Sequence, residues 1–230
     1  MSKLILQKKA LSRPNKLARY AANLESDNVI ESGKTIFKNL AGNWKATYFK
    51  NSNPITLELA CGKGEYTIGL AAKFQDQNYV GVDLKGNRIW VGSQQAQKMG
   101  LENVGFIRSR IELLPDFFLP NEVDEIWLTF PDPRPKDRDE KHRLTNLVYL
   151  NLYKSILKSD GWFKFKTDNT ELFEYTLEVL KSFSVAGLEY TTDLYNSDFL
   201  KEHFDLQTKY EKIWTAKGES IKYLKFKFVT

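Results

Sequence analysis

The feature that most constrains the fold is a regular alternation of strand-like and helix-like segments from about residue 54 onward. Short apolar segments predict strands at 55–59, 79–83, 104–107, 123–129 and 161–167. Helical spacing of apolar residues marks the segments between or after them: around Ile68 and at 85–99, 144–158 and 172–183. Repeated strand–helix units build mostly parallel sheets joined by right-handed crossovers. We therefore predict an α/β, Rossmann-like fold.

The C-terminal region predicts an antiparallel end to this sheet. A further strand is expected at 188–192, and residues 221–229 alternate apolar side chains with tyrosine and lysine, as a half-buried strand does. The turn at Lys217-Gly218 suggests a closing antiparallel hairpin. We expect seven strands, in a domain that spans residues 41–230 after a basic, partly helical N-terminal extension at 1–40.

Composition limits the class of protein and its compartment. Of the 230 residues, 42% are hydrophobic and 27% are charged, the balance of a soluble globular protein. No apolar run reaches the ~20 residues of a membrane span, and the N-terminus lacks the apolar core of a signal peptide. The single cysteine, Cys61, excludes an internal disulfide. We expect a cytoplasmic protein with no membrane contact. With only two histidines, His142 and His203, which we expect at the surface, no metal site is expected.

Positive charge is gathered in three parts of the chain, whose net charge is +5. No acidic residue precedes Glu25. The first cluster consists of Lys3, Lys8, Lys9, Arg13, Lys16 and Arg19. The second consists of Arg134, Lys136, Arg138, Lys141 and Arg143, and the third of Lys217, Lys222, Lys225 and Lys227. Three separated clusters favour a polyanionic partner; a solvated surface with a disordered arm is the alternative.

A glycine-containing loop after the strand at 55–59 predicts a ligand site. Residues 58–64 read Glu-Leu-Ala-Cys-Gly-Lys-Gly, and the glycines at Gly62 and Gly64 allow a tight turn and a close approach to a ligand. Asp83 ends the next strand, where an acid can bind ribose hydroxyls. A tight turn without a ligand is the alternative.

The ligand of this loop could be a dinucleotide or S-adenosylmethionine. Thr67 stands where the dinucleotide motif has its third glycine, which disfavours the dinucleotide. Glu58, an acid inside the strand, favours a cationic ligand such as a sulfonium compound with an amino group.

A proline-rich segment, Phe-Pro-Asp-Pro-Arg-Pro-Lys at 130–136, follows the strand at 123–129. Phe130, Asp132 and Arg134 each precede a proline, so we predict a stiff, extended backbone that holds the Asp132 carboxylate in place. Ligands of parallel sheets bind at the carboxyl ends of the strands. The loops at 60–65, 130–136 and 167–169 are therefore expected to meet in one crevice.

Taken together, these segments resemble the bacterial tRNA (guanine-N7-)-methyltransferase family. The resemblance runs, in order, through ELACGKG, YVGVD, FPDPRPKDRDEKHRL and FKTDN, and Thr208-Lys209-Tyr210-Glu211 is similar to that family's T-x-Y-E. It implies a Rossmann-like methyltransferase fold and an enzyme that uses S-adenosylmethionine. It also implies tRNA as the partner and N7 of a guanosine in the variable loop as the methyl acceptor.

The resemblance also implies roles for individual residues. The cofactor-binding residues would be Glu58, Gly62, Gly64, Asp83 and Asp132, and Asp132 would also be catalytic. The substrate-binding residues would be Lys136, Asp168, Thr208, Lys209, Tyr210 and Glu211. The adenine pocket would take Arg110 or Glu112, between which the sequence does not choose. The chain departs from the family at Arg134, where tryptophan is usual, and at Asp137 and Asp139, where basic residues are usual.

The chemistry of guanine N7 fixes what an acid such as Asp132 can do. N7 carries a lone pair and no proton, so no general base is needed. A fixed carboxylate can instead follow the developing positive charge and orient the base through its N1–H and amino group. Asp168 could take the orienting role, but Asp168 and Glu171 could also be only a capping box. Residues 208–211 could simply shape the turn into the last strand.

Two other functions stay open at this point: methylation of another RNA or a small molecule, and a non-catalytic RNA-binding subunit on the same fold. The oligomeric state, monomer or homodimer, is also open.

Overall fold

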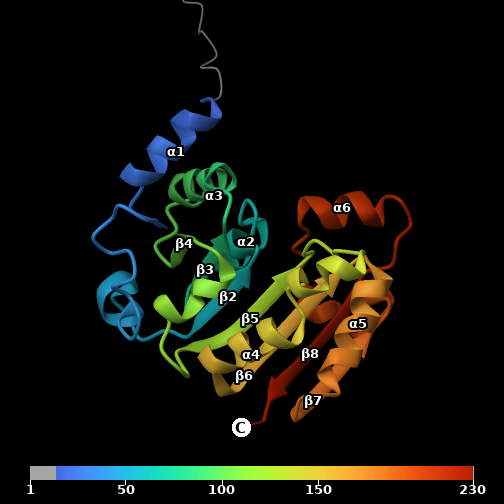
Figure 1. Cartoon of the computed structure of the whole chain (residues 1–230). Coiled ribbons are helices and arrows are strands. Elements are labelled where there is room, and N and C mark those ends of the chain that lie inside the picture. Colours follow the sequence, from blue (N-terminus) through green and yellow to red (C-terminus); the bar gives the residue numbers. More distant parts are fainter. Residues whose placement is uncertain (1–13, 230) are drawn as a thin grey trace, which may run out of the picture.

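A single mixed sheet forms the centre of the molecule in the computed structural model, which describes residues 14–229 (Figure 1). Within these residues the sheet has eight strands in the order β1-β4-β3-β2-β5-β6-β8-β7. The strands are β1 (Val29–Ile30), β2 (Ile55–Leu59), β3 (Asn78–Asp83), β4 (Val104–Arg108), β5 (Val123–Thr129), β6 (Leu157–Thr167), β7 (Val185–Thr191) and β8 (Lys222–Phe228). Neighbouring strands pair in parallel, except that β8 is antiparallel to both β6 and β7. The predicted α/β, Rossmann-like fold is confirmed.

Helices cover both faces of the sheet. The α-helices are α1 (Lys16–Glu25), α2 (Glu65–Lys73), α3 (Gly86–Lys98), α4 (Leu147–Ile156), α5 (Thr170–Leu180) and α6 (Lys209–Thr215). The chain also has a short π-helix, η1 (Trp44–Phe49), and the short 3₁₀ helices η2 (Ile111–Asp116), η3 (Asp137–His142), η4 (Leu194–Asn196) and η5 (Asp198–His203). One apolar cluster packs α4 and α5 on one side of the sheet, and a second packs α2 and α3 on the other. Within the described residues, none of these helices has the length and apolar character that crossing a membrane requires.

The described residues form eight strands, one more than the seven that we expected. The additional strand, β1, has only two residues, too few for any periodicity to mark it. It pairs with β4 and lies inside the expected extension at 1–40. The described part of that extension also contacts the sheet's helices, since Asn23 of α1 donates a hydrogen bond to the Gly86 carbonyl of α3. A domain boundary near residue 40 stays a prediction.

The C-terminal hairpin is the second correction. β7 and β8 pair antiparallel, as expected, but no tight turn joins them. The connecting residues, 192–221, form η4, η5 and α6, which the sequence did not mark. The turn at Gly218 ends α6 instead, with its N–H donating to the Thr215 carbonyl. Because of this long connection, β8 lies between β6 and β7.

Candidate active site

A cavity of about 1150 Å³ opens at the carboxyl ends of the parallel strands. All three loops that were expected to meet there, at 60–65, 130–136 and 167–169, contribute to its lining, which confirms the predicted crevice. The predicted site residues that line it are Glu58, Gly62, Asp83, Arg110, Asp132, Asp168, Thr208, Lys209 and Tyr210. Three others, Gly64, Lys136 and Glu211, lie outside the lining.

The glycine loop makes the turn between β2 and α2 through left-handed backbone. Gly62 and Gly64 have φ angles of 60° and 66°. A Cβ at Gly62 would meet no atom within 4 Å, whereas a Cβ at Gly64 would lie 2.5 Å from the ring of Phe106. Gly62 is therefore open toward the cavity, and Gly64 is required for packing of the turn against β4.

Asp83 fixes this turn from the end of β3. One carboxylate oxygen accepts from the Gly62 N–H at 2.9 Å and the other from the Lys85 N–H at 2.7 Å. The side chain is nearly buried. An ionised carboxylate has about four lone-pair positions, so Asp83 can still accept hydrogen bonds from a ligand.

Glu58 lies in the middle of β2 and is 4% exposed. Its carboxyl group accepts from the Thr67 N–H at 2.8 Å, from the Thr67 hydroxyl and, at 2.8 Å, from the Thr129 hydroxyl. Burial raises its pKa from 4.5 to about 7, against the effect of these hydrogen bonds. Thr67, whose presence argues against a dinucleotide ligand, thus donates hydrogen bonds to Glu58, the acid that favours a cationic ligand. Glu58 and Asp83 together form what we call the buried wall.

The proline-rich segment is not extended throughout, contrary to our prediction. Phe130 and Arg134 have φ angles of 50° and 49°, in the left-handed region. A following proline disfavours right-handed helix, but tertiary contacts decide between the remaining conformations. The Phe130 N–H donates to the Lys166 carbonyl at 2.8 Å, and Arg143 Nε donates to the Arg134 carbonyl at 3.1 Å.

Asp132 and Arg134 form the exposed wall of the cavity. Their side chains are 65% and 45% exposed, and Arg134 Nε lies 3.2 Å from an Asp132 carboxylate oxygen. The Arg134 N–H donates to the other oxygen at 3.3 Å. Arg134, one of the residues at which the chain departs from the family pattern, therefore pairs with the predicted catalytic acid.

Both candidates for the adenine pocket line the cavity. Arg110 and Glu112 form an ion pair at 3.3 Å, and the Tyr149 hydroxyl donates to Glu112 at 2.9 Å. Partial burial acts to raise the pKa of Glu112, but hydrogen bonds from its own backbone, Tyr149 and Arg110 bring the pKa below its usual value. The choice between the two residues stays a prediction.

Asp168 lines the cavity just after β6, and partial burial raises its pKa. The alternative role, a capping box with Glu171, is wrong. The N-cap of α5 is Asn169, whose side-chain oxygen accepts from the Leu172 N–H at 2.7 Å. The Asp168 carboxylate is thus not used as the helix cap.

Residues 208–211 begin α6 rather than a turn into the last strand. Thr208 is the N-cap, and with Glu211 it forms a capping box. Thr208, Lys209 and Tyr210 line the cavity, but the Glu211 side chain is 0% exposed and does not. Direct contact of Glu211 with a substrate is therefore not supported by its position.

The Glu211 carboxylate instead pairs with buried side chains beneath the cavity. It lies 3.0 Å from Lys166 Nζ, on β6, and 2.8 Å from His203 Nε2. Burial acts to raise the pKa of Glu211, but His203 and the Lys166 ammonium group bring it below its usual value. His203 was expected at the surface and is buried. Sequence reasoning missed Lys166 because its partner lies 45 residues away, and missed His203 because η5 and α6, which bring it to Glu211, were not predicted.

The predicted basic clusters differ in how free their charges are. In the second cluster, Lys136, Arg138 and Lys141 are exposed on or beside η3. In the third cluster, Lys225 is paired with Glu202 at 2.5 Å and Lys222 is buried, whereas Lys217 is exposed. Residues of the first cluster before position 14 lie outside the described residues, whereas its Lys16 and Arg19 belong to α1.

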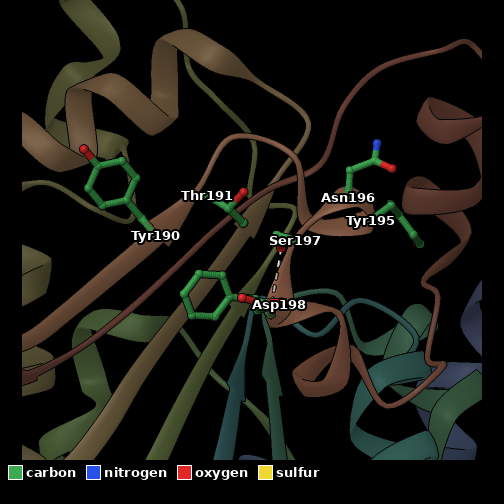
Figure 2. A pocket seen from close by; sticks show the side chains of 7 residues that line it. Tyr190, Thr191, Tyr195, Asn196, Ser197 and Asp198 are labelled. Carbon is green, nitrogen blue, oxygen red and sulfur yellow. Dashed lines mark hydrogen bonds between the residues drawn. The ribbon is translucent and has the colours of Figure 1, made fainter.

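A second, shallower pocket of about 640 Å³ lies beside η4 and η5 (Figure 2). Figure 2 shows Tyr190 and Thr191 on one side and Asn196 and Ser197 on the other. None of the predicted site residues lines this pocket. Within residues 14–229 no group of three or more His, Cys, Asp or Glu side chains is arranged to hold a metal ion.

Comparison with known proteins places the chain among methyltransferases. Among solved structures, the 16S rRNA methyltransferase KamB matches with a TM-score of 0.60 at 14% identity, over 80% of this chain and 92% of that one. A 30S ribosomal A1408 methyltransferase from an uncultured bacterium matches with a TM-score of 0.59 at 16% identity, over 87% and 98%. At these identities the likeness establishes the fold. A family model described as "Putative methyltransferase" matches residues 52–224.

Curated relatives narrow this class to one family. The tRNA (guanine-N(7)-)-methyltransferase of Cytophaga hutchinsonii is 45% identical over 216 residues, which cover 93% of this chain and 97% of that protein. The protein of the same name from Christiangramia forsetii is 44% identical over 219 residues, with 93% and 97% coverage. The chain belongs to the tRNA (guanine-N(7)-)-methyltransferase family, as its motifs predicted.

Proposed function

We propose that the protein transfers a methyl group from S-adenosylmethionine to N7 of a guanosine in the variable loop of tRNA. The observation that carries this proposal is the meeting of Glu58, Asp83 and Asp132 in one cavity, beside a glycine that is open to a ligand. Family membership supports the same reaction.

The buried wall suits the cofactor. Gly62 leaves room for a ligand to approach the backbone, and Asp83 is held where it can accept hydrogen bonds from ribose hydroxyls. Glu58, when ionised, would attract the cationic methionine end. Arg110 or Glu112 would contact the adenine. S-adenosylmethionine, when bound, supplies a methyl group on a positively charged sulfur.

The exposed wall suits the methyl acceptor. Asp132 can accept hydrogen bonds from the N1–H and amino group of guanine, which would orient the base. As positive charge moves onto the ring, the fixed carboxylate stabilises the transition state electrostatically. Asp168 lies on the same cavity and could share the orienting role.

Cations around the cavity suit tRNA phosphates. Lys63, Lys85, Arg88 and Lys209 line the cavity, and Lys136 is exposed near its exposed wall. Phosphate contacts of this kind position an RNA without reading its sequence. Such a partner would place the protein in the cytoplasm, and no metal is required for the reaction as proposed.

The direct test is incubation of the protein with S-adenosylmethionine and unmodified tRNA, followed by nucleoside mass spectrometry for 7-methylguanosine. Asp132→Asn is expected to lower turnover about 10²–10³-fold, because it removes the charge and keeps the shape. Asp160→Asn, an exposed acid on β6 outside the cavity lining, is the matched control and should retain full turnover.

Absence of 7-methylguanosine, with a folded protein that binds the cofactor by calorimetry, would contradict the proposal. Normal turnover of Asp132→Asn would refute the role given to that carboxylate. If instead a different RNA or a small molecule is methylated and tRNA does not compete, the substrate is wrong but the chemistry stands.

A further inference from the structure

Arg134 is bound to Asp132 through two atoms, which leaves complementary groups free on both side chains. Nε and the backbone N–H of Arg134 face the two carboxylate oxygens, at 3.2 Å and 3.3 Å. The Nη groups of Arg134 donate no hydrogen bond to any residue among 14–229, and both side chains line the cavity. The pair therefore presents spare N–H donors next to spare carboxylate lone pairs.

The position of Arg134 is fixed from the opposite side as well. Arg143 Nε donates to its carbonyl at 3.1 Å, and the Arg143 guanidinium stacks over the ring of Tyr175 at 4.4 Å. Tyr175 in turn donates to Glu140 at 2.9 Å. A non-glycine residue in a left-handed conformation is strained and persists only where its surroundings impose it. Arg134, with φ of 49°, is such a residue.

The N–H donors of Arg134 beside the carboxylate of Asp132 are complementary to the Watson–Crick edge of only one of the two purines. The Watson–Crick edge of guanine presents the O6 acceptor next to the N1–H and amino donors. Adenine presents an amino donor in place of O6 and an unprotonated N1. Enzymes that act on an extruded base read this edge by hydrogen bonds. Arg134 beside Asp132 is complementary to guanine and mismatched at both atoms with adenine.

We propose that Arg134 selects guanine by donating from its Nη groups to O6 while Asp132 accepts from N1–H and the amino group. This inference rests on the proposed function. Arginine usually contacts O6 and N7 of guanine together, which would block the methyl acceptor. Here Nε already pairs with Asp132, so a base that binds Asp132 through its N1–H and amino group would meet the Nη groups at O6, with N7 left free.

Base analogues separate this contact from a general loss of activity. Three tRNAs assembled from synthetic halves would carry guanine, hypoxanthine or 2-aminopurine at the methylated position. All three keep N7. Hypoxanthine lacks only the amino group, and 2-aminopurine lacks O6 and the N1 proton. The measurement is kcat/KM for methylation of each tRNA by the wild-type chain, Arg134→Met and Arg134→Lys, with Arg138→Met as the control for loss of one exposed cation.

In Arg134→Met, the preference for guanine over 2-aminopurine is expected to fall about 10- to 100-fold, the range for one hydrogen bond to a charged group. The preference for guanine over hypoxanthine should be unchanged, because only Asp132 reads the amino group. Arg134→Lys should retain part of the first preference. Arg138→Met should leave both preferences unchanged and lower all three values equally.

Two results would overturn the inference. If neither preference changes in Arg134→Met, the residue does not read the base. If both fall together, Arg134 acts only by holding Asp132. Methylation of the guanine tRNA by the wild-type chain is the separate check on the proposed function, because its absence would refute that function and not the reading of O6.

Discussion

The two walls of the cavity are built in opposite ways. In the buried wall, Glu58 and Asp83 sit on or at the end of regular strands, and each is held by at least two hydrogen bonds from backbone or hydroxyl groups. In the exposed wall, Asp132 lies on an irregular loop and is held by an ion pair with a neighbour two residues away. Burial of the first wall excludes water and raises the pKa of Glu58. In the second wall, Asp132 stays accessible to a large partner.

The largest expected effect concerns the fully buried ion pair of Lys166 and Glu211. Lys166→Met removes the cation from the fully buried pair with Glu211 and leaves a buried carboxylate without it. Breaking such a pair costs about 3–5 kcal/mol of unfolding free energy. Urea denaturation would measure this loss. The matched control is Lys181→Met, which breaks an exposed pair with Glu178 and should cost about 0–1 kcal/mol.

A loss from Lys166→Met no larger than that of the control would mean that the buried pair does not stabilise the fold. The Lys166 side chain also lies against the proline-rich segment, since its Nζ is 5.8 Å from the centre of the Phe130 ring. The variant is therefore expected to lower turnover in addition to stability.

A smaller effect is expected for the buried wall, where the affinity for the cofactor should depend on pH. The Glu58 pKa is about 7, so the carboxyl group is mostly ionised at pH 8 and mostly protonated at pH 6. Because the ionised form attracts a cationic ligand, affinity for S-adenosylmethionine should fall about tenfold from pH 8 to pH 6. Calorimetry at both pH values would measure it. Glu58→Gln should bind weakly at both, and an equal pH dependence in this variant would assign the titration elsewhere.

The same group makes an opposite contribution to stability. Its pKa is raised on folding, from 4.5 to about 7, so the folded protein holds the proton more tightly than the unfolded chain. The stability that this proton provides is full below about pH 4.5 and is lost as the pH rises through about 7. If Glu58 binds the cofactor as proposed, the conditions that favour binding are thus those in which its ionised carboxylate destabilises the fold.

The smallest expected effect concerns the basic residues at the start of the chain. Removal of residues 1–13 deletes the basic side chains of Lys3, Lys8, Lys9 and Arg13 and leaves α1 intact. The logarithm of tRNA affinity falls linearly with the logarithm of salt concentration. For each phosphate contact that is lost on a duplex, the slope of this line should become shallower by about 0.9. Binding measured across a salt series would detect it. A chain with these four residues changed to glutamine is the control, and an unchanged slope would show that they bind no phosphate.

The sequence predicted the buried wall better than the exposed one, for a physical reason. Glu58 and Asp83 follow from local periodicity and from the rule that parallel strands end at one edge, so their convergence needs no knowledge of side-chain contacts. The left-handed backbone of Phe130 and Arg134 depends on Lys166 and Arg143, which lie many residues away. No local pattern encodes those partners.

The same distinction explains the other errors. Lys166 alternates with phenylalanines as a half-buried strand residue would. It is buried because elements distant in the chain pack against it, among them α6, which carries Glu211, and α2, which carries Tyr66. One signal in the sequence could have been used: Thr67 stands where the dinucleotide motif has its third glycine. A hydroxyl at that position, nine residues after an acid in the strand, is what holds Glu58.

The place of β8 in the sheet has a consequence for how the protein is made. Within the described residues β7 pairs only with β8, and β8 follows it by some 30 residues of chain. During synthesis β7 therefore emerges with neither of its edges paired and must wait until residues 222–228 have left the ribosome. Insertion of β8 between β6 and β7 then closes the sheet in one late, long-range step, of the kind that slows folding. Until that step, the nascent chain exposes unpaired edges on both β6 and β7, which are sites where a chaperone would act or aggregation would begin.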